Sequence, residues 1–151
     1  MVFASSGFGP GLIPFAPATM ASVAMAAALF LAAHHLAFSY LLALTVVVTA
    51  VGVPVGASAE RVGSGKDPKW FVLDEYAGMA IVFLVNPITL TTCVAGFVLF
   101  RVFDVLKLWP ADWCENLRGG WGIMLDDVFA GLYAGIILAI FRAILALIHP
   151  A

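Results

Sequence analysis

Long apolar runs are the feature that most constrains the fold of this chain. The segment from Thr19 to about Leu36 is almost free of polar groups, and the run from Phe38 to Gly56 follows it. Each run approaches the roughly 20 residues that an α-helix needs to cross a lipid bilayer. The chain is 64% hydrophobic and 11% charged, which differs strongly from the composition of a soluble domain. We therefore predict an all-α protein, a small polytopic membrane bundle that forms one domain over residues 1–151.

Polar connectors divide the rest of the chain into further helices. The connectors are Ser58–Lys69 and Ala111–Gly122, and between them lie the apolar segments Trp70–Val85 and Ile88–Leu108. A last helix is predicted from about Leu125 to Ile148. The bundle would therefore contain about four to five helical segments. The first of the middle segments is short enough to be half-buried or re-entrant.

Charge placement predicts how the helices are oriented. Five of the seven Lys and Arg residues lie in Ser58–Lys69 and in the stretch Lys107–Gly122. If the two middle apolar segments pair as a hairpin, both cationic stretches lie on the same side of the membrane as the N-terminus. The positive-inside rule makes that side cytoplasmic. The same topology gathers the acidic residues described next at one membrane face.

Carboxylates beside apolar runs are the first sign of a functional site. Five of the nine acidic residues form three clusters: Asp74 with Glu75, then Asp104, then Asp126 with Asp127. A carboxylate at membrane depth costs roughly 2.5–3.5 kcal/mol, so a chain that keeps several there needs them. An acidic pair such as the first, taken alone, is usually a helix cap. Three clusters accompanied by cations instead favour a divalent-metal site that handles a phosphorylated group.

The segment R-V-F-D-V-L-K-L-W-P supplies the cations. Arg101, Asp104 and Lys107 are three residues apart and would share one helical face. They could form a self-neutralising ladder of ion pairs at a helix end. They could equally offer an arginine fork and a lysine charge to phosphate oxygens, with the aspartate as a metal ligand. Spacing alone does not choose between these readings.

Asp126 and Asp127 fall in the first turn of the predicted last helix, where the helix dipole favours negative charge. This explains one carboxylate better than two, because adjacent carboxylates repel each other and a shared cation would relieve that repulsion. Gly131 and Gly135 form a G-x-x-x-G pair on the face of Asp127. We interpret these glycines as a close packing contact with a neighbouring helix.

Several other classes of function are disfavoured. The net charge of −2, with no basic run, gives no support for nucleic-acid binding. Cys93 and Cys114 make neither a disulfide framework nor a zinc motif. No serine elbow is present and no histidine lies near an acidic cluster, so a serine or histidine nucleophile is not expected.

Four blocks of the sequence resemble bacterial phosphatidylglycerophosphatase A. They are S-S-G-F-G-P-G-L-I-P-F-A-P-A-T-M-A-S at Ser5–Ser22, D-E-Y-A-G-M at Asp74–Met79, R-x-x-D-x-x-K-x-W-P at Arg101–Pro110, and G-G-x-G-I-M-x-D-D-x-x-A-G at Gly119–Gly131. The resemblance runs from about Gly7 to Gly135 in the family's order. Two positions depart from the family pattern, which usually has glycine at Ala18 and proline at Leu108.

The resemblance implies a magnesium-dependent, multi-pass lipid phosphatase of the bacterial inner membrane, with its active site facing the cytoplasm. Its substrate would be phosphatidylglycerophosphate, converted to phosphatidylglycerol and phosphate in phosphatidylglycerol and cardiolipin biosynthesis. The implied catalytic acids and Mg²⁺ ligands are Asp74, Glu75, Asp104, Asp126 and Asp127, and the implied phosphate-binding residues are Arg101, Lys107, Thr19 and Ser22. One of the aspartates could instead act as general base or nucleophile. One or two Mg²⁺ ions and a homo-oligomer are both compatible with the sequence.

Two rival functions stay open. A phosphatidyl-group transferase also needs clustered aspartates and a metal, although the usual D-G…A-R opening of that group is absent. A cation transporter predicts carboxylates near the bilayer midplane on broken helices, whereas these carboxylates lie near segment ends. In every case membrane lipids surround the protein.

Overall fold

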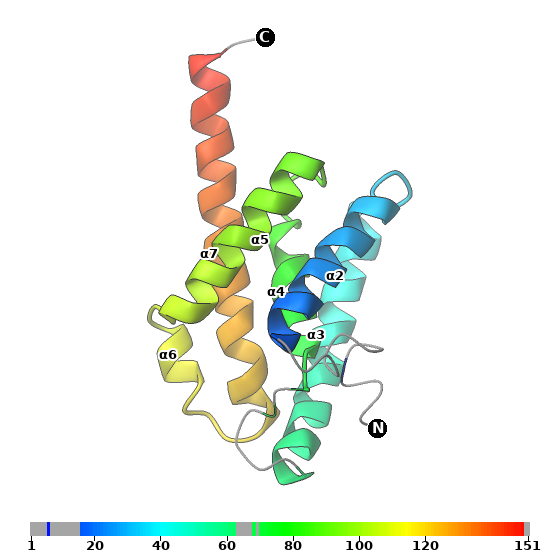
Figure 1. Ribbon diagram of the computed structural model, residues 1–151, viewed down its shortest axis with the longest axis vertical. Coiled ribbons are helices and arrows are strands. Elements are labelled where there is room, and N and C mark those ends of the chain that lie inside the picture. Colours follow the sequence, from blue (N-terminus) through cyan, green and yellow to red (C-terminus); the bar gives the residue numbers. More distant parts are fainter. Residues whose placement is uncertain (1–5, 7–15, 63–67, 69, 150–151) are drawn as a thin grey trace.

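The computed structural model describes residue 6, residues 16–62, residue 68 and residues 70–149 (Figure 1). That part of the chain contains helices and no strand, which confirms the all-α prediction. The helices are α2 (Pro17–Ala32), α3 (Phe38–Val62), α4 (Leu73–Val82), α5 (Leu90–Leu106), α6 (Ala111–Cys114) and α7 (Gly120–Ile148).

Two helices extend further than the apolar runs predict. α3 contains Pro54 and continues past the predicted end at Gly56 to Val62. The first part of the predicted connector Ser58–Lys69 is therefore helical. Residues 63–67 and 69 of that connector lie outside the described residues. α3 is longer than its apolar run because the backbone hydrogen bonds of a helix do not depend on apolar side chains, so the helix continues into the polar residues. The predicted connector Ala111–Gly122 likewise contains α6 and the first turn of α7.

The start of α7 depends on glycine. Gly119 precedes the helix with a φ of 68°, a conformation that residues with a side chain rarely adopt. Gly120 then lies so close to α3 that a Cβ there would collide with the Val53 carbonyl oxygen. α7 therefore begins at this contact with α3, one turn earlier than the predicted start near Leu125.

α4 is short and lies at the centre of the bundle. It packs against α2, α3, α5 and α7 (Figure 1), and eight of its ten residues are buried. A Cβ on Gly131 of α7 would collide with the carbonyl oxygen of Gly78 on α4, and one on Gly135 would lie 3.3 Å from the Val82 Cα. The predicted glycine packing contact is confirmed, and its neighbour is α4.

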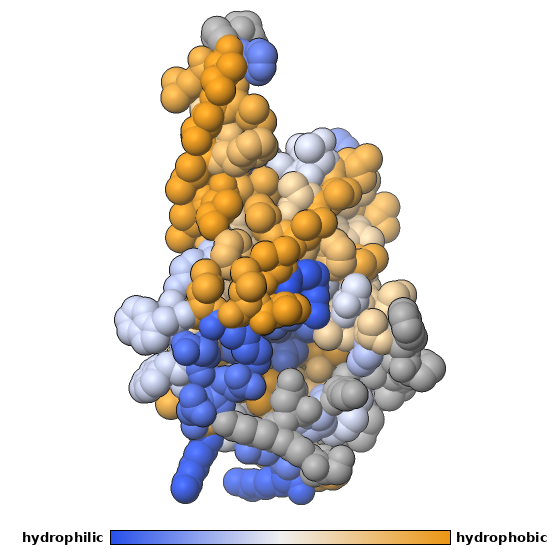
Figure 2. All heavy atoms as spheres, turned by 60° about the vertical axis from the view of Figure 1, so that its left-hand side comes forward, coloured by the Kyte–Doolittle hydropathy of each residue, from blue (hydrophilic) through white to orange (hydrophobic). Residues whose placement is uncertain are grey.

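The helices alternate in direction, so that one end of the bundle collects most of the polar groups. α2, α4 and α7 begin at this end, and α3 and α5 finish there (Figure 1). Figure 2 shows hydrophilic residues at the same end and a hydrophobic surface above them. The predicted hairpin of the two middle segments is therefore confirmed, and Arg61, Lys107 and Arg118 lie at the end where α2 begins. Lys66 and Lys69 lie outside the described residues.

Membrane association is supported by the surface of the helices. α3 and α7 are each long and apolar enough to cross a bilayer. Large apolar side chains are exposed along both, including Val46 and Val47 on α3 and Ile140 and Phe141 on α7. The last turns of α7 extend beyond the other helices (Figure 1). At this far end Asn86 donates hydrogen bonds from Nδ2 to the carbonyl oxygens of Val82 and Gly135, which ties α4 to α7.

Candidate active site

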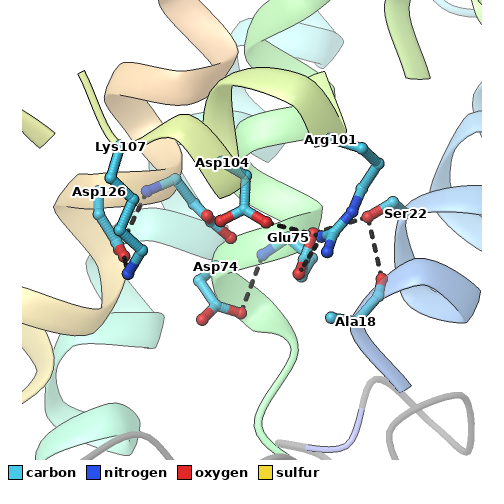
Figure 3. Close-up of polar contacts among 9 residues, drawn as sticks. Ala18, Ser22, Asp74, Glu75, Arg101, Asp104, Lys107 and Asp126 are labelled. Atoms are coloured by element: carbon cyan, nitrogen blue, oxygen red, sulfur yellow. Dashed lines mark hydrogen bonds and ion pairs between the residues drawn. The ribbon is translucent and has the colours of Figure 1, made fainter. Parts of the chain in front are cut away.

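The three acidic clusters meet at the polar end of the bundle (Figure 3). Asp74 and Glu75 lie in the first turn of α4, as predicted. Asp104 lies in the last turn of α5. Asp126 and Asp127 lie about two turns into α7, because the helix begins at Gly120. The expectation that they occupy its first turn is wrong, and the helix dipole therefore does not explain them.

Glu75 links three helices through its carboxylate. Its Oε1 accepts a hydrogen bond from Arg101 Nη1 of α5 at 2.7 Å. Its Oε2 lies 2.6 Å from the hydroxyl of Ser22 on α2, a hydroxyl that is also 2.9 Å from the Ala18 carbonyl oxygen. Ser22 is fully buried and Glu75 nearly so. Both carboxylate oxygens of Glu75 are thus already bonded within the protein.

Arg101 also pairs with Asp104 within α5, at 3.0 Å between Nη1 and Oδ2. The predicted ladder of ion pairs along α5 is therefore present between Arg101 and Asp104, but it does not include Lys107. α5 ends at Leu106, and Lys107 adopts a φ of 44° that turns the chain away from the helix. Its Nζ instead lies 3.1 Å from Asp126 Oδ2 and 3.1 Å from Glu115 Oε1.

Lys107 stays charged in this position. Burial favours its neutral form, but the carboxylates of Asp126 and Glu115 outweigh that effect, so the pKa of Lys107 is raised above its ordinary value. Lys107 and Asp126 thereby join the end of α5 to α7. Glu115 was not predicted as a site residue, because it lies in the connector and only the fold brings it to Lys107.

Asp127 is the most unusual carboxylate of the site. Only 4% of its surface is exposed, and no described residue forms an ion pair with it. The carboxylates of Glu75, Asp74, Asp104 and Asp126 all act on it electrostatically. A buried carboxylate that forms no ion pair and has several negative neighbours is strongly unfavourable. A cation from outside the described part of the chain would relieve this repulsion.

The donor set suits a hard divalent cation. Carboxylate oxygens are the ligands that Mg²⁺ prefers, and it is usually held by one or two of them together with waters and substrate phosphates. Among the described residues, no three carboxylate, histidine or cysteine side chains are arranged so that together they could hold a metal ion. An ion bound here would therefore complete its coordination with water or substrate, which leaves positions open for chemistry.

The remaining predicted residues lie nearby. Asp74 is buried, and its Oδ1 accepts a hydrogen bond from the Glu75 backbone N–H at 2.9 Å. Thr19 lies half-buried on α2, about one turn before Ser22. Most of the Ser5–Ser22 motif, residues 5 and 7–15, lies outside the described residues.

Tyr133 is a supporting residue that sequence reasoning missed. Its hydroxyl donates a hydrogen bond to the Trp109 carbonyl oxygen at 2.6 Å, and its ring lies 5.6 Å from that of Phe103. It thus holds the loop after Lys107 against α7. Nothing in the sequence pairs these positions, which are brought together only by tertiary packing.

Comparison with known proteins places this site in a family. The sequence profile of phosphatidylglycerophosphatase A matches residues 3–142. Phosphatidylglycerophosphatase A of Escherichia coli is 36% identical over 144 residues, which cover 87% of this chain and 77% of the relative. The Haemophilus influenzae protein of the same name is 34% identical over 134 residues, covering 87% of this chain and 82% of the relative.

A protein of Bacteroides thetaiotaomicron named "Putative phosphatidylinositol-3-phosphatase" is 38% identical over 149 residues, covering 93% of this chain and 92% of the relative. No solved structure matches the chain. The family profile spans nearly the whole chain and includes every residue of the site, from Thr19 to Asp127. The chain therefore belongs to the phosphatidylglycerophosphatase A family of lipid phosphatases.

Proposed function

We propose that this protein hydrolyses the terminal phosphomonoester of phosphatidylglycerophosphate, giving phosphatidylglycerol and phosphate. The reaction would take place at the cytoplasmic face of the bacterial inner membrane and serve phosphatidylglycerol and cardiolipin biosynthesis. The observation that carries the proposal is the buried Asp127 among four other carboxylates, with Arg101 and Lys107 beside them, at the polar end of an apolar bundle. A phosphate carried by a lipid headgroup would reach this position from the membrane surface.

The two cations supply the charge that a phosphate requires. Both carboxylate contacts of Arg101 use Nη1, so its other N–H groups can donate to phosphate oxygens. Lys107 contributes a second positive charge from the side of α7. Together they would neutralise the phosphoryl oxygens as negative charge shifts during P–O bond cleavage.

We further propose that the site holds Mg²⁺. Asp127 would be its primary ligand, because it forms no ion pair with a described residue. The carboxylates of Asp74 and Asp104, which act on Asp127 electrostatically, would add negative charge around the ion. When bound, the ion would polarise the phosphoryl group and favour attack by an oxygen nucleophile. Glu75, held rigidly from two sides, would keep Arg101 in position, and Asp126 would do the same for Lys107.

Phosphatidylinositol 3-phosphate is the second candidate substrate. It is favoured by the name of the Bacteroides thetaiotaomicron relative at 38% identity. Both lipids present a phosphomonoester at the membrane surface, and they differ in whether it is carried by glycerol or by an inositol ring. The charges at the site suit either.

Phosphate release from purified protein in detergent micelles tests both proposals. Phosphatidylglycerophosphate, phosphatidylinositol 3-phosphate and phosphatidic acid would be compared by kcat/KM. The Asp127→Asn protein, purified in parallel, controls for contaminating phosphatase. We expect the first lipid to be preferred, EDTA to abolish release and excess Mg²⁺ to restore it. Preference for the inositol lipid would select the second candidate, and full activity in EDTA would refute the metal site.

A further inference from the structure

An open apolar groove of about 290 Å³ runs between α2 and α5. On the α2 side it is lined by Val23, Ala27 and Phe30. Small side chains form its floor: Ala26 and Cys93 are both buried, and the Cys93 Sγ lies 3.9 Å from the Ala26 carbonyl oxygen. The groove follows α2 for about 10 Å, the rise of the seven residues from Val23 to Phe30. Val23, Phe30 and Val94 are exposed, so the groove opens to the outside of the bundle.

The α5 wall of this groove leads directly to the candidate active site. Val94 and Phe97 line the groove, and Arg101 follows them on the same face at helical spacing. α5 runs towards the polar end of the bundle (Figure 1), so Arg101 lies below the apolar residues. The polar end of the α5 wall is thus the guanidinium that binds Glu75 and Asp104.

The α2 wall ends in the same way. Ala27, Val23 and Thr19 are spaced four residues apart and share one face, with Thr19 nearest the polar end. Ser22, on the neighbouring stripe, bonds to the same Glu75 carboxylate as Arg101 does. Glu75 thus joins the two helices on the polar side of the groove, through Ser22 of α2 and Arg101 of α5 (Figure 3). The two walls are apolar along the groove and carry a hydroxyl and a guanidinium beyond it. This order of apolar and polar groups matches that of a phospholipid, with its acyl chain and its charged headgroup.

We propose that the α2–α5 groove is the subsite for one acyl chain of the phospholipid substrate, which enters sideways from the bilayer. This inference rests on the proposed phospholipid substrate. The bilayer interior is as apolar as the groove, so the groove adds little affinity. Its role is to fix the position of the lipid, so that the headgroup phosphate lies beside Arg101. Displacement of a substrate by about 1 Å can cost about 100-fold in rate, so position matters more than affinity here.

Filling the groove tests this role. Ala27→Phe places a ring in the channel, and Ala27→Leu is a smaller version in case the first variant does not accumulate. Ala50→Phe is the matched control, because Ala50 is also exposed and lines a different apolar groove between α3 and Trp121. The assay compares kcat/KM for long-chain phosphatidylglycerophosphate and for its water-soluble deacylated headgroup.

We expect Ala27→Phe to lower kcat/KM for the long-chain lipid by about tenfold or more while leaving the deacylated substrate unaffected. Ala50→Phe should leave both unchanged. Equal behaviour of the two variants, or an equal loss on both substrates, would overturn the proposal.

A second measurement is independent of which lipid is hydrolysed. Phosphatidic acid with a photoactivatable acyl chain should label peptides of α2 and α5 in the wild-type and Ala50→Phe proteins, and much less in Ala27→Phe. Labelling spread evenly over all exposed helices would mean that only bulk lipid contacts the groove. Specific labelling with no hydrolysis of phosphatidylglycerophosphate would instead refute the proposed substrate and leave the groove assignment standing.

Discussion

At the scale of single residues, the acidic groups of the site differ in what balances their charge. Glu75 and Asp126 each contact a cation, Arg101 and Lys107 respectively. Asp127 is as deeply buried as Glu75 but has no ion-pair partner among the described residues. Removing water from a carboxylate is tolerable only when another group replaces that stabilisation. The absence of an ion-pair partner for Asp127 among the described residues is the strongest argument for an external cation.

Neutralising Asp127 should separate catalysis from folding. Asp127→Asn and Asp104→Asn keep the size of the side chain but remove the charge that a metal ion needs. Since a metal contributes several kcal/mol of transition-state stabilisation, we expect each to lower turnover per folded molecule by about 100-fold or more. Both proteins should still accumulate in membranes. Asp112→Asn is the control, because Asp112 is exposed and its side chain accepts a hydrogen bond from the Trp113 backbone N–H that an asparagine oxygen can also accept. Near-normal turnover in the first two variants would mean that the site is assigned wrongly.

Arg101 should depend on its shape as well as its charge. Arg101→Lys retains a positive charge but supplies one nitrogen where the guanidinium supplies several donors. The lysine could hold the carboxylates of Glu75 and Asp104 or a phosphate, but not both. Hydrogen bonds to charged groups are worth about 1.5–3 kcal/mol, so we expect kcat/KM to fall about ten- to 100-fold. Steady-state kinetics on the lipid substrate measure this, and an unchanged kcat/KM would show that Arg101 does not contact the phosphate.

At the scale of elements, the site depends on how closely α7 approaches α4. The backbones of the two helices touch at Gly131 and Gly78 without intervening side chains. This contact brings Asp127 over the first turn of α4, where Asp74 and Glu75 lie. Small residues are the means by which helices in membranes approach so closely. The glycines thus position the acidic groups without taking part in chemistry.

Gly135→Leu should damage this packing and little else. The added side chain meets Val82 and Val85 of the α4 end, and overpacking of this kind typically costs about 1–3 kcal/mol. We expect a lower thermal midpoint in detergent and poorer accumulation, with activity per folded molecule close to wild type. Ala143→Leu, on the exposed last part of α7, should change neither quantity. If Gly135→Leu accumulates normally but is inactive, the glycine has a role in chemistry that packing does not explain.

At the scale of the whole molecule, polar residues lie at the two ends of an apolar bundle. The acidic clusters, Arg101 and Lys107 lie where α2, α4 and α7 begin. The turn between α2 and α3, with exposed His34 and His35, lies at the other end (Figure 1). A bilayer around the apolar middle would place these ends in different compartments, and the positive-inside rule predicts that the end with the acidic clusters faces the cytoplasm.

Cysteine accessibility tests this orientation. In a protein without native cysteines, His35→Cys and Asn116→Cys place single thiols at exposed positions of the two ends. A membrane-impermeant maleimide should label His35→Cys in intact spheroplasts and Asn116→Cys only after permeabilisation. The opposite pattern would put the active site on the wrong face for a cytoplasmic-leaflet lipid. Native Cys114 is unsuitable as a probe because it is buried.

Much of the fold follows from local patterns. The apolar runs predicted the helices, and pairing the two middle segments as a hairpin predicted their alternating direction, because both depend on which short segments are apolar and which are polar. Helix limits were less well predicted: α3 reaches Val62 and α7 starts at Gly120. The start of α7 depends on a backbone contact between α3 and α7 at Val53 and Gly120, which apolarity does not encode.

The sequence by itself determined which residues could form the site, because carboxylates and cations beside apolar helices are too costly to keep without a partner or a use. Only the tertiary structure decided how they are paired. Lys107 leaves the helical ladder for Asp126 and Glu115, and Ser22 reaches Glu75. Such pairings join positions far apart in the chain, so they depend on how helices cross. Packing around α4 also buries Asp127 where no described residue forms an ion pair with it.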